Sequence, residues 1–159
     1  MLHLSKENRT LIEAHGEGGF PDEVCGFLIG TAKGDDKTIA EVWPIENAWE
    51  SAGDSLSGAS AEFLDQPKGR RFFIPPDEWL RSDKRAREKG LDILGCYHTH
   101  PNHPARPSVY DLEMARGTFP GYSYIILAVQ SGVAAQMTSW VLRDDYSEFD
   151  AEEIVTGDA

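Results

Sequence analysis

The segment LDILGCYHTHP, residues 91–101, limits what this chain can fold into more than any other stretch. It is an apolar run of strand length that ends at a proline, which cannot continue a sheet ladder through its nitrogen. Side chains of a strand alternate between its two faces, so His98 and His100 are predicted to project together while Thr99 points away. The run therefore predicts a buried strand that carries two imidazoles to the rim of a sheet, which is half of a zinc site.

The other apolar runs predict strands and helices that alternate along the chain. Ser5 is a helix cap and Gly16 a helix end, so a helix is expected over residues 6–15. The remaining expectations are a hairpin over 23–30 and 38–45, a short strand at 71–74, helices at 75–90 and from Ser108, and a hairpin over 122–130 and 134–142. This order predicts an α/β fold, with a single mixed β-sheet domain flanked by helices.

Two segments fall outside this pattern. Residues 47–69 are rich in Ser, Gly, Ala and Asp without a sustained period, so they are expected to form a long loop with Trp49 exposed. The tail, residues 144–159, is acidic and is expected to be flexible. The domain is accordingly assigned to residues 1–143.

Charge and apolar content argue against two classes of partner. The 15 Lys and Arg against 27 Asp and Glu give a formal charge of −12, which disfavours nucleic acid and anionic membranes. The apolar run at 124–129 is far shorter than the ~20 residues of a membrane span. Cys25 and Cys96 can form at most one disulfide, so both are expected to be reduced thiols filling the core of a cytoplasmic protein; redox or metal roles for them stay open.

A proline-rich loop separates the histidines from Ser108 and Asp111, which have the spacing of a helix-capping pair. Capping alone accounts for both residues. Because the helix begins just after this stiff loop, Asp111 is also placed to serve as a third ligand beside His98 and His100. Two His and one carboxylate leave a fourth zinc position for water, and Glu23 is a candidate base for that water.

The chain resembles the JAMM (MPN-plus) metallopeptidases in four linked features. These are Glu23 in EVCGFLIG, the His98-x-His100-Pro sequence, the seven residues between His100 and Ser108, and the S-x-x-D that ends at Asp111. The similarity spans roughly residues 2–142 and is greatest to the small prokaryotic branch. It implies an MPN/JAMM architecture, similar to that of cytidine deaminases. It also implies that zinc (Zn2+) is bound by His98, His100 and Asp111, that Glu23 is the general base, and that Ser108 helps to hold the oxyanion.

The resemblance further implies hydrolysis of the peptide bond after the C-terminal Gly-Gly tail of a ubiquitin-like or sulfur-carrier protein. One branch releases cysteine, which would give a role in cysteine biosynthesis. Residues 48–69 occupy the place of a variable insertion that clamps the tail in relatives. Two alternatives remain: an isopeptidase that removes a ubiquitin-like modifier from lysine, and a non-catalytic MPN scaffold. The oligomeric state is open, a dimer included.

Overall fold

A computed structural model describes residues 1–49, 71–118 and 120–157 of the chain. Within these residues no helix is long and apolar enough to cross a membrane. The elements are β1 (Leu2–Ser5), α1 (Lys6–Gly19), β2 (Cys25–Lys33), β3 (Asp36–Ile45), α3 (Pro76–Glu88), β4 (Asp92–Pro101), α4 (Val109–Ala115), β5 (Ser123–Gln130), β6 (Val133–Leu142), β7 (Phe149–Glu152) and β8 (Ile154–Gly157).

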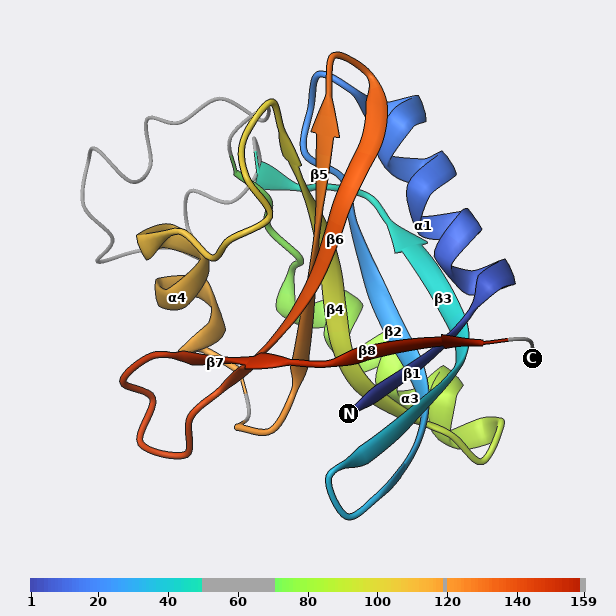
Figure 1. The fold of residues 1–159 in the computed structure, drawn as a ribbon. Coiled ribbons are helices and arrows are strands. Elements are labelled where there is room, and N and C mark those ends of the chain that lie inside the picture. The colour runs from blue at the N-terminus through green and yellow to red at the C-terminus, as the bar shows by residue number, and fades with distance from the viewer. Residues whose placement is uncertain (50–70, 119, 158–159) are drawn as a thin grey trace.

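The strands form one eight-stranded mixed sheet in the order β7-β6-β5-β4-β2-β3-β1-β8. The β1–β3, β1–β8 and β4–β5 pairs are parallel and the others are antiparallel. Helices α1 and α4 lie on opposite sides of the sheet (Figure 1). The predicted α/β fold with a mixed sheet between helices is therefore confirmed, as are both predicted hairpins.

The central strand β4 contains a bulge that sets the direction of its last side chains. Leu28 and Ile29 of β2 pair with Gly95 and Ile93, so Leu94 has no partner in that ladder. A Cβ on residue 95 would lie 1.8 Å from the carbonyl oxygen of Ser123, so only glycine fits there. Beyond the bulge β4 continues without interruption between β2 and β5, which holds its carboxyl end rigidly.

Helix α1 begins where the sequence predicts and ends later. The Ser5 side chain accepts the Asn8 N–H at 3.1 Å, which confirms the predicted cap. The prediction that Gly16 ends the helix is wrong, because α1 continues to Gly19. A Cβ at residue 16 would lie 2.9 Å from Leu127 Cδ2, so this glycine serves close packing of the helix on the sheet.

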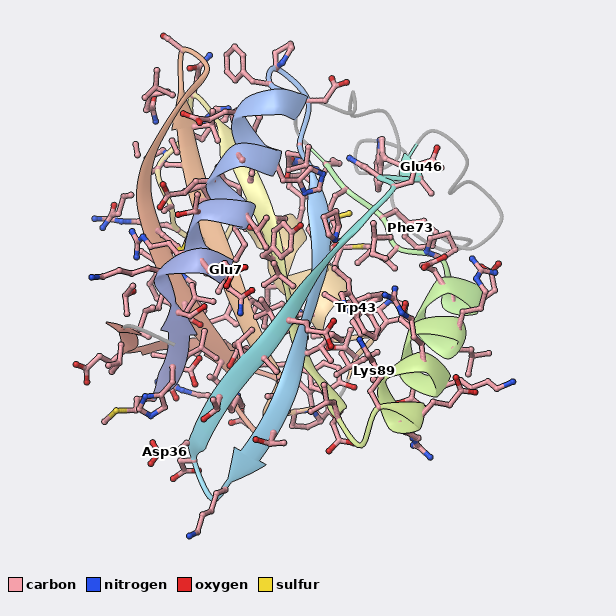
Figure 2. The ribbon with its side chains drawn as sticks, turned by 90° about the vertical axis from the view of Figure 1, so that its right-hand side faces the viewer. Glu7, Asp36, Trp43, Glu46, Phe73 and Lys89 are labelled. Carbon is pink, nitrogen blue, oxygen red and sulfur yellow. The ribbon has the colours of Figure 1, made fainter. Side chains whose placement is uncertain are left out.

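Two apolar cores cover the two faces of the sheet. One includes Ile12 of α1 with Tyr97 and Leu127. The other includes Phe27 and Trp43 and packs beneath α3 and α4. Figure 2 shows Trp43 on the hairpin facing α3, close to Lys89, whose Nζ lies 5.9 Å from the Trp43 ring centre. The predicted helix over 75–90 is thus confirmed as α3, held by its contact with this second core.

The prediction of a flexible acidic tail is wrong for residues 149–157. β7 pairs with β6 and β8 pairs with β1, and these two strands, separated only by Glu153, run across one end of the sheet (Figure 1). A buried polar cluster holds them there. Glu152 accepts hydrogen bonds from Ser123 at 2.6 Å and Ser139 at 2.8 Å, and Lys37 donates to Ser123 at 2.7 Å.

Two smaller predictions also differ from the structure. Residues 71–74 form no strand; they are held through Asn47, whose side-chain oxygen accepts the Phe73 N–H at 3.1 Å. Trp49 is buried against Phe73 and not exposed, and Asn47 Oδ1 accepts its backbone N–H at 3.0 Å. The rest of the predicted loop, residues 50–69, lies outside the described residues.

Candidate functional site

The site begins at the carboxyl end of β4, where both imidazoles turn to the same face. His98 is 1% exposed and His100 is 8% exposed. Their Nε2 atoms approach to 3.1 Å. Thr99 points to the opposite face, as predicted, where its methyl group packs toward α1 and its hydroxyl accepts the Val24 N–H at 2.9 Å.

Helix α4 brings Asp111 onto these histidines through its first turn. Ser108 caps the helix: its Oγ accepts the Asp111 N–H at 3.0 Å, and Asp111 Oδ2 accepts the Ser108 N–H at 2.9 Å. The same carboxylate reaches His98 Nε2 with Oδ1 at 3.2 Å and His100 Nε2 with Oδ2 at 3.0 Å. Capping and convergence on the histidines are therefore two roles of one residue, and the two readings of the sequence are compatible.

The three donor groups have the spacing that a small tetrahedral cation requires. Zinc bonds of about 2.0–2.1 Å at tetrahedral angles put neighbouring ligand atoms roughly 3.3 Å apart. The observed separations between the ligand atoms of His98, His100 and Asp111 are 3.0–3.2 Å. Two imidazole nitrogens with lone pairs repel one another at that distance unless a proton or a metal ion lies between them. The donor set therefore fits zinc.

A hydrogen bond on the far side of the His100 ring determines which of its two nitrogens faces Asp111 and His98. His100 Nδ1 lies 2.8 Å from the carbonyl oxygen of Pro104, which can only accept, so Nδ1 carries the proton and Nε2 keeps its lone pair. His98 Nδ1 is buried and has no hydrogen-bond partner among the described residues, and its ring stacks on Phe72 with centres 4.5 Å apart. Both rings are thus fixed in direction before any ion binds.

Burial and the neighbouring charges shift the pKa values of His98, His100 and Asp111 in different directions. Burial lowers the pKa of His98, and the charge of Asp111 only partly opposes this. For His100, burial is outweighed by the hydrogen bond and charge of Asp111, so its pKa is raised. Burial would raise the pKa of Asp111, but the two histidines hold it far below its usual range. Asp111 is therefore ionised, as a metal ligand must be.

Glu23 lies just before β2 and faces the two histidines. It is 3% exposed, and its carboxylate offers an atom within 4.8 Å of the ligand nitrogens of His98 and His100. Asn47 donates to its carbonyl oxygen at 2.9 Å, which fixes the backbone beside the site. Burial raises the pKa of Glu23 well above its usual value, and Asp111 adds to this. A carboxylate in that environment holds a proton more readily than an exposed one.

A cavity of about 380 Å³ opens beside these groups; we name it the Glu23 cavity. Ser108 lines it together with Glu23 and His100. Because the Ser108 oxygen accepts the Asp111 N–H, its own O–H proton remains available as a donor. The other lining residues are Arg71, Pro101, His103, Pro104, Arg106 and Tyr110. Sequence reasoning missed both arginines, although Arg106 stands inside the loop that joins the histidines to Ser108.

A larger, mainly apolar cavity of about 770 Å³ lies on the other side of the cluster, under α3 and α4. His98 and Asp111 reach it, and so does Cys96. Cys25 and Cys96 are both buried and form no disulfide with each other, and burial raises the pKa of Cys96 to about 12. A thiol with that pKa is protonated at neutral pH, which fits the predicted role of core filler.

Comparison with known protein families gives a match over most of the chain. The model of the prokaryotic homologues of the JAB domain (Prok-JAB) matches residues 5–143. A protein named desampylase from Haloferax volcanii is 29% identical over 138 residues, which cover 84% of this chain and 85% of the relative. A Thermus thermophilus protein named "Probable TtuB-protein conjugate cleaving protease" is 36% identical over 64 residues, 40% of each chain.

Solved structures agree with this match. A protein from Desulfitobacterium hafniense superposes with a TM-score of 0.77 at 31% identity, covering 100% of this chain and 94% of its own. A protein from Salinibacter ruber gives 0.68 at 38% identity, with 99% and 92% covered. A JAB1/MPN domain protein from Archaeoglobus fulgidus gives 0.55 at 16% identity over 98% of both chains, which bears on the fold alone.

Proposed function

Because the chain belongs to the Prok-JAB family and is a hydrolase of the JAB type, we propose that it is a zinc peptidase acting at the C-terminal tail of a ubiquitin-like protein. The family match confirms the resemblance to JAMM proteins noted in the sequence. The observation that carries the proposal is the convergence of His98, His100 and Asp111 beside the buried carboxyl group of Glu23.

His98, His100 and Asp111 would hold the zinc ion. When bound there, zinc would supply a Lewis acid that acidifies water and polarises a carbonyl group. The protein contributes the fixed directions of the two rings and the ionised carboxylate of Asp111. The Ser108 cap and the stiff loop before it keep that carboxylate in place without metal, so the site is largely preformed.

The remaining chemistry falls to two side chains that line the Glu23 cavity. Glu23 takes a proton from the attacking water and passes it to the leaving amine, a task suited to a carboxylate whose pKa is raised by burial. Ser108 donates its O–H to the carbonyl oxygen as negative charge develops there. Water adds to the carbonyl carbon, the C–N bond breaks, and the products are a carboxylate and a free amine.

The substrate proposal rests on the relatives and on the shape of the site. The names desampylase and TtuB-protein conjugate cleaving protease support a protein modifier as the group removed. A tail ending in Gly-Gly suits a buried site, since glycine lets an extended backbone approach without a Cβ. We propose a cytoplasmic enzyme, because Cys25 and Cys96 are buried and are not joined by a disulfide.

Two leaving groups remain, and one experiment separates them. A ubiquitin-like carrier ending in Gly-Gly-Cys and a carrier linked through Gly-Gly to a peptide lysine are each incubated with zinc-loaded protein, and products are measured by intact mass. Loss of cysteine favours the sulfur-carrier reading and a role in cysteine biosynthesis, whereas release of the lysine peptide favours the isopeptidase. Glu23→Gln should abolish both reactions.

The third reading, a non-catalytic scaffold, makes the opposite prediction. If neither substrate is cleaved by protein that contains one zinc ion per chain, the hydrolase proposal for these substrates fails. If in addition the protein binds no zinc, the scaffold reading is favoured over any metal chemistry at this site.

A further inference from the structure

The Glu23 cavity is lined by more positive than negative charge, in a chain whose formal charge is −12. Arg71 and Arg106 both contribute to its wall. Among the described residues that line it, Glu23 is the sole carboxylate, and it is 3% exposed. The charge of Arg71 lowers the pKa of Glu23 and so opposes the effect of burial, but neither arginine is needed to hold a zinc ion, and the positive charge at the cavity calls for a further explanation.

Arg106 is the clearer of the two cations. Its side chain is exposed at the cavity, and its guanidinium makes no hydrogen bond or ion pair with any residue of the described ranges 1–49, 71–118 and 120–157. Its backbone is held by the Arg106 N–H to the Pro104 carbonyl oxygen at 2.8 Å, and Pro107 follows directly. A charged group on a restrained loop is thereby kept at the cavity without an acidic partner among the residues that the structure describes.

Arg71 is positioned by an aromatic ring. Its guanidinium carbon lies 3.3 Å from the ring centre of Tyr110, a stacked arrangement that fixes the plane of the group. A guanidinium stacked by its face still presents N–H donors along its edges, in the fork that matches a carboxylate. Since Tyr110 belongs to α4, one residue before Asp111, this arginine is tied to the same short helix that completes the metal cluster.

We propose that Arg71 and Arg106 bind a carboxylate carried by the leaving group of the substrate. The inference rests on the proposed function, because Glu23 and Ser108 can act only on a carbonyl placed in the cavity that they line. In a substrate that ends one residue beyond the scissile bond, the terminal carboxyl carbon is two covalent bonds from the leaving nitrogen. It must then lie in this same small cavity.

The carboxylate has two possible sources, which the test separates. One is the α-carboxylate of a single amino acid that follows the Gly-Gly tail. The other is an acidic side chain next to a modified lysine. Two matched pairs of substrates distinguish them: a carrier ending in Gly-Gly-Cys as free acid or as carboxamide, and a carrier linked to a lysine peptide with Asp or Asn after the lysine.

The wild-type protein should favour the carboxylate member of one pair by roughly 10- to 100-fold in kcat/KM, as expected for a charge-assisted hydrogen bond. Arg106→Gln should reduce this preference to within about threefold, mainly by slowing the reaction of the carboxylate member. Arg71→Gln should act in the same direction. Arg81→Gln is the matched control, because Arg81 lies on the exposed face of α3 and pairs with Asp77 and Glu78.

Equal rates within both pairs would overturn the proposal while leaving the proposed function intact. So would an Arg106→Gln protein that loses activity equally on both members, since that is the mark of a structural role. If no substrate turns over, binding decides: Glu23→Gln protein is titrated by calorimetry with the acid and amide carriers and the two lysine-linked carriers. Tighter binding of a carboxylate member, lost in Glu23→Gln/Arg106→Gln, supports the site, and equal binding within both pairs refutes it.

Discussion

The buried cluster around Glu152 should contribute measurably to the free energy of unfolding. The side chains of Lys37 and Glu152 are 11% and 8% exposed, and Lys37 Nζ lies 3.7 Å from Glu152 Oε2. Burial lowers the pKa of Lys37, while Glu152 and, to a smaller extent, the charge of Asp35 oppose that shift, so Glu152 contributes most to keeping the lysine charged. Glu152→Gln removes this charge and leaves the size and hydrogen-bonding oxygen in place.

The expected cost follows from the burial of the pair. Breaking a buried ion pair by removing one partner costs about 3–5 kcal/mol in the free energy of unfolding. Because glutamine can still accept from Ser123 and Ser139, we expect a value near 3 kcal/mol. For a chain of this length that corresponds to a Tm lower by roughly 6–12 °C.

Urea and thermal unfolding, followed by circular dichroism at fixed zinc concentration, measure this effect. Glu153→Gln is the matched control, because that neighbouring side chain is exposed and its replacement should change stability by less than about 0.5 kcal/mol. Lys37→Met in the Glu152→Gln background should recover part of the loss, since it removes the unpaired buried charge. A loss under 1 kcal/mol, equal to that of Glu153→Gln, would refute the argument that this pair fixes the C-terminal strands.

Three further predictions concern the site and the helix that packs behind it. Ser108→Ala should cost about 1 kcal/mol of stability through the lost helix cap and should slow hydrolysis by ~10²–10³-fold. Ser108→Thr should keep most of the stability and most of the hydrolytic rate. Equal rates for Ser108→Ala and wild type would show that Ser108 takes no part in the chemistry. Gly18→Ala should stabilise α1 by about 0.5–1 kcal/mol, because the added methyl group meets nothing within 4 Å. Gly16→Ala should destabilise the protein, because its methyl group crowds Leu127. Thermal unfolding checks both, since the Tm should rise in the first variant and fall in the second. Zinc affinity should weaken steadily as pH falls from 7.5 to 5.5, since His98 and His100 must be neutral to bind the ion; calorimetry at several pH values should also detect proton release on binding.

The sequence predicts the site better than it predicts the edges of the sheet. His98 and His100 follow from strand alternation alone, and the spacing of Ser108 and Asp111 announces a helix start that the structure confirms. The placement of Glu23 beside them depends on the pairing of β2 with β4, residues that are some seventy positions apart, so the sequence offers Glu23 only as a candidate base, to which the family resemblance adds support. Spacing along the chain carries no information about such a contact.

What the sequence did not predict depends on contacts that no local pattern reveals. β1, β7 and β8 are four residues each, which is too short for a clear alternation of apolar and polar side chains. Nothing in the acidic sequence 144–153 distinguishes Glu152, whose carboxylate is buried and holds β7 and β8 in place, from its exposed neighbours. Gly16 looks like a helix end because its close contact with the sheet is invisible in the sequence. Arg71 and Arg106 were missed for the same reason, because they line one cavity only when the chain is folded.

We propose that His98, His100 and Asp111 hold zinc while Glu23 does not bind the ion and acts as a base. Because Glu23 lies close enough to the histidines to be a ligand itself, zinc titration of the Glu23→Gln protein tests the claim most directly. We expect the Glu23→Gln protein to bind one zinc ion per chain with an affinity close to that of wild type and to lack hydrolytic activity, whereas His100→Gln should lose the ion. Loss of zinc binding in Glu23→Gln, or full hydrolysis by it, would contradict the assignment.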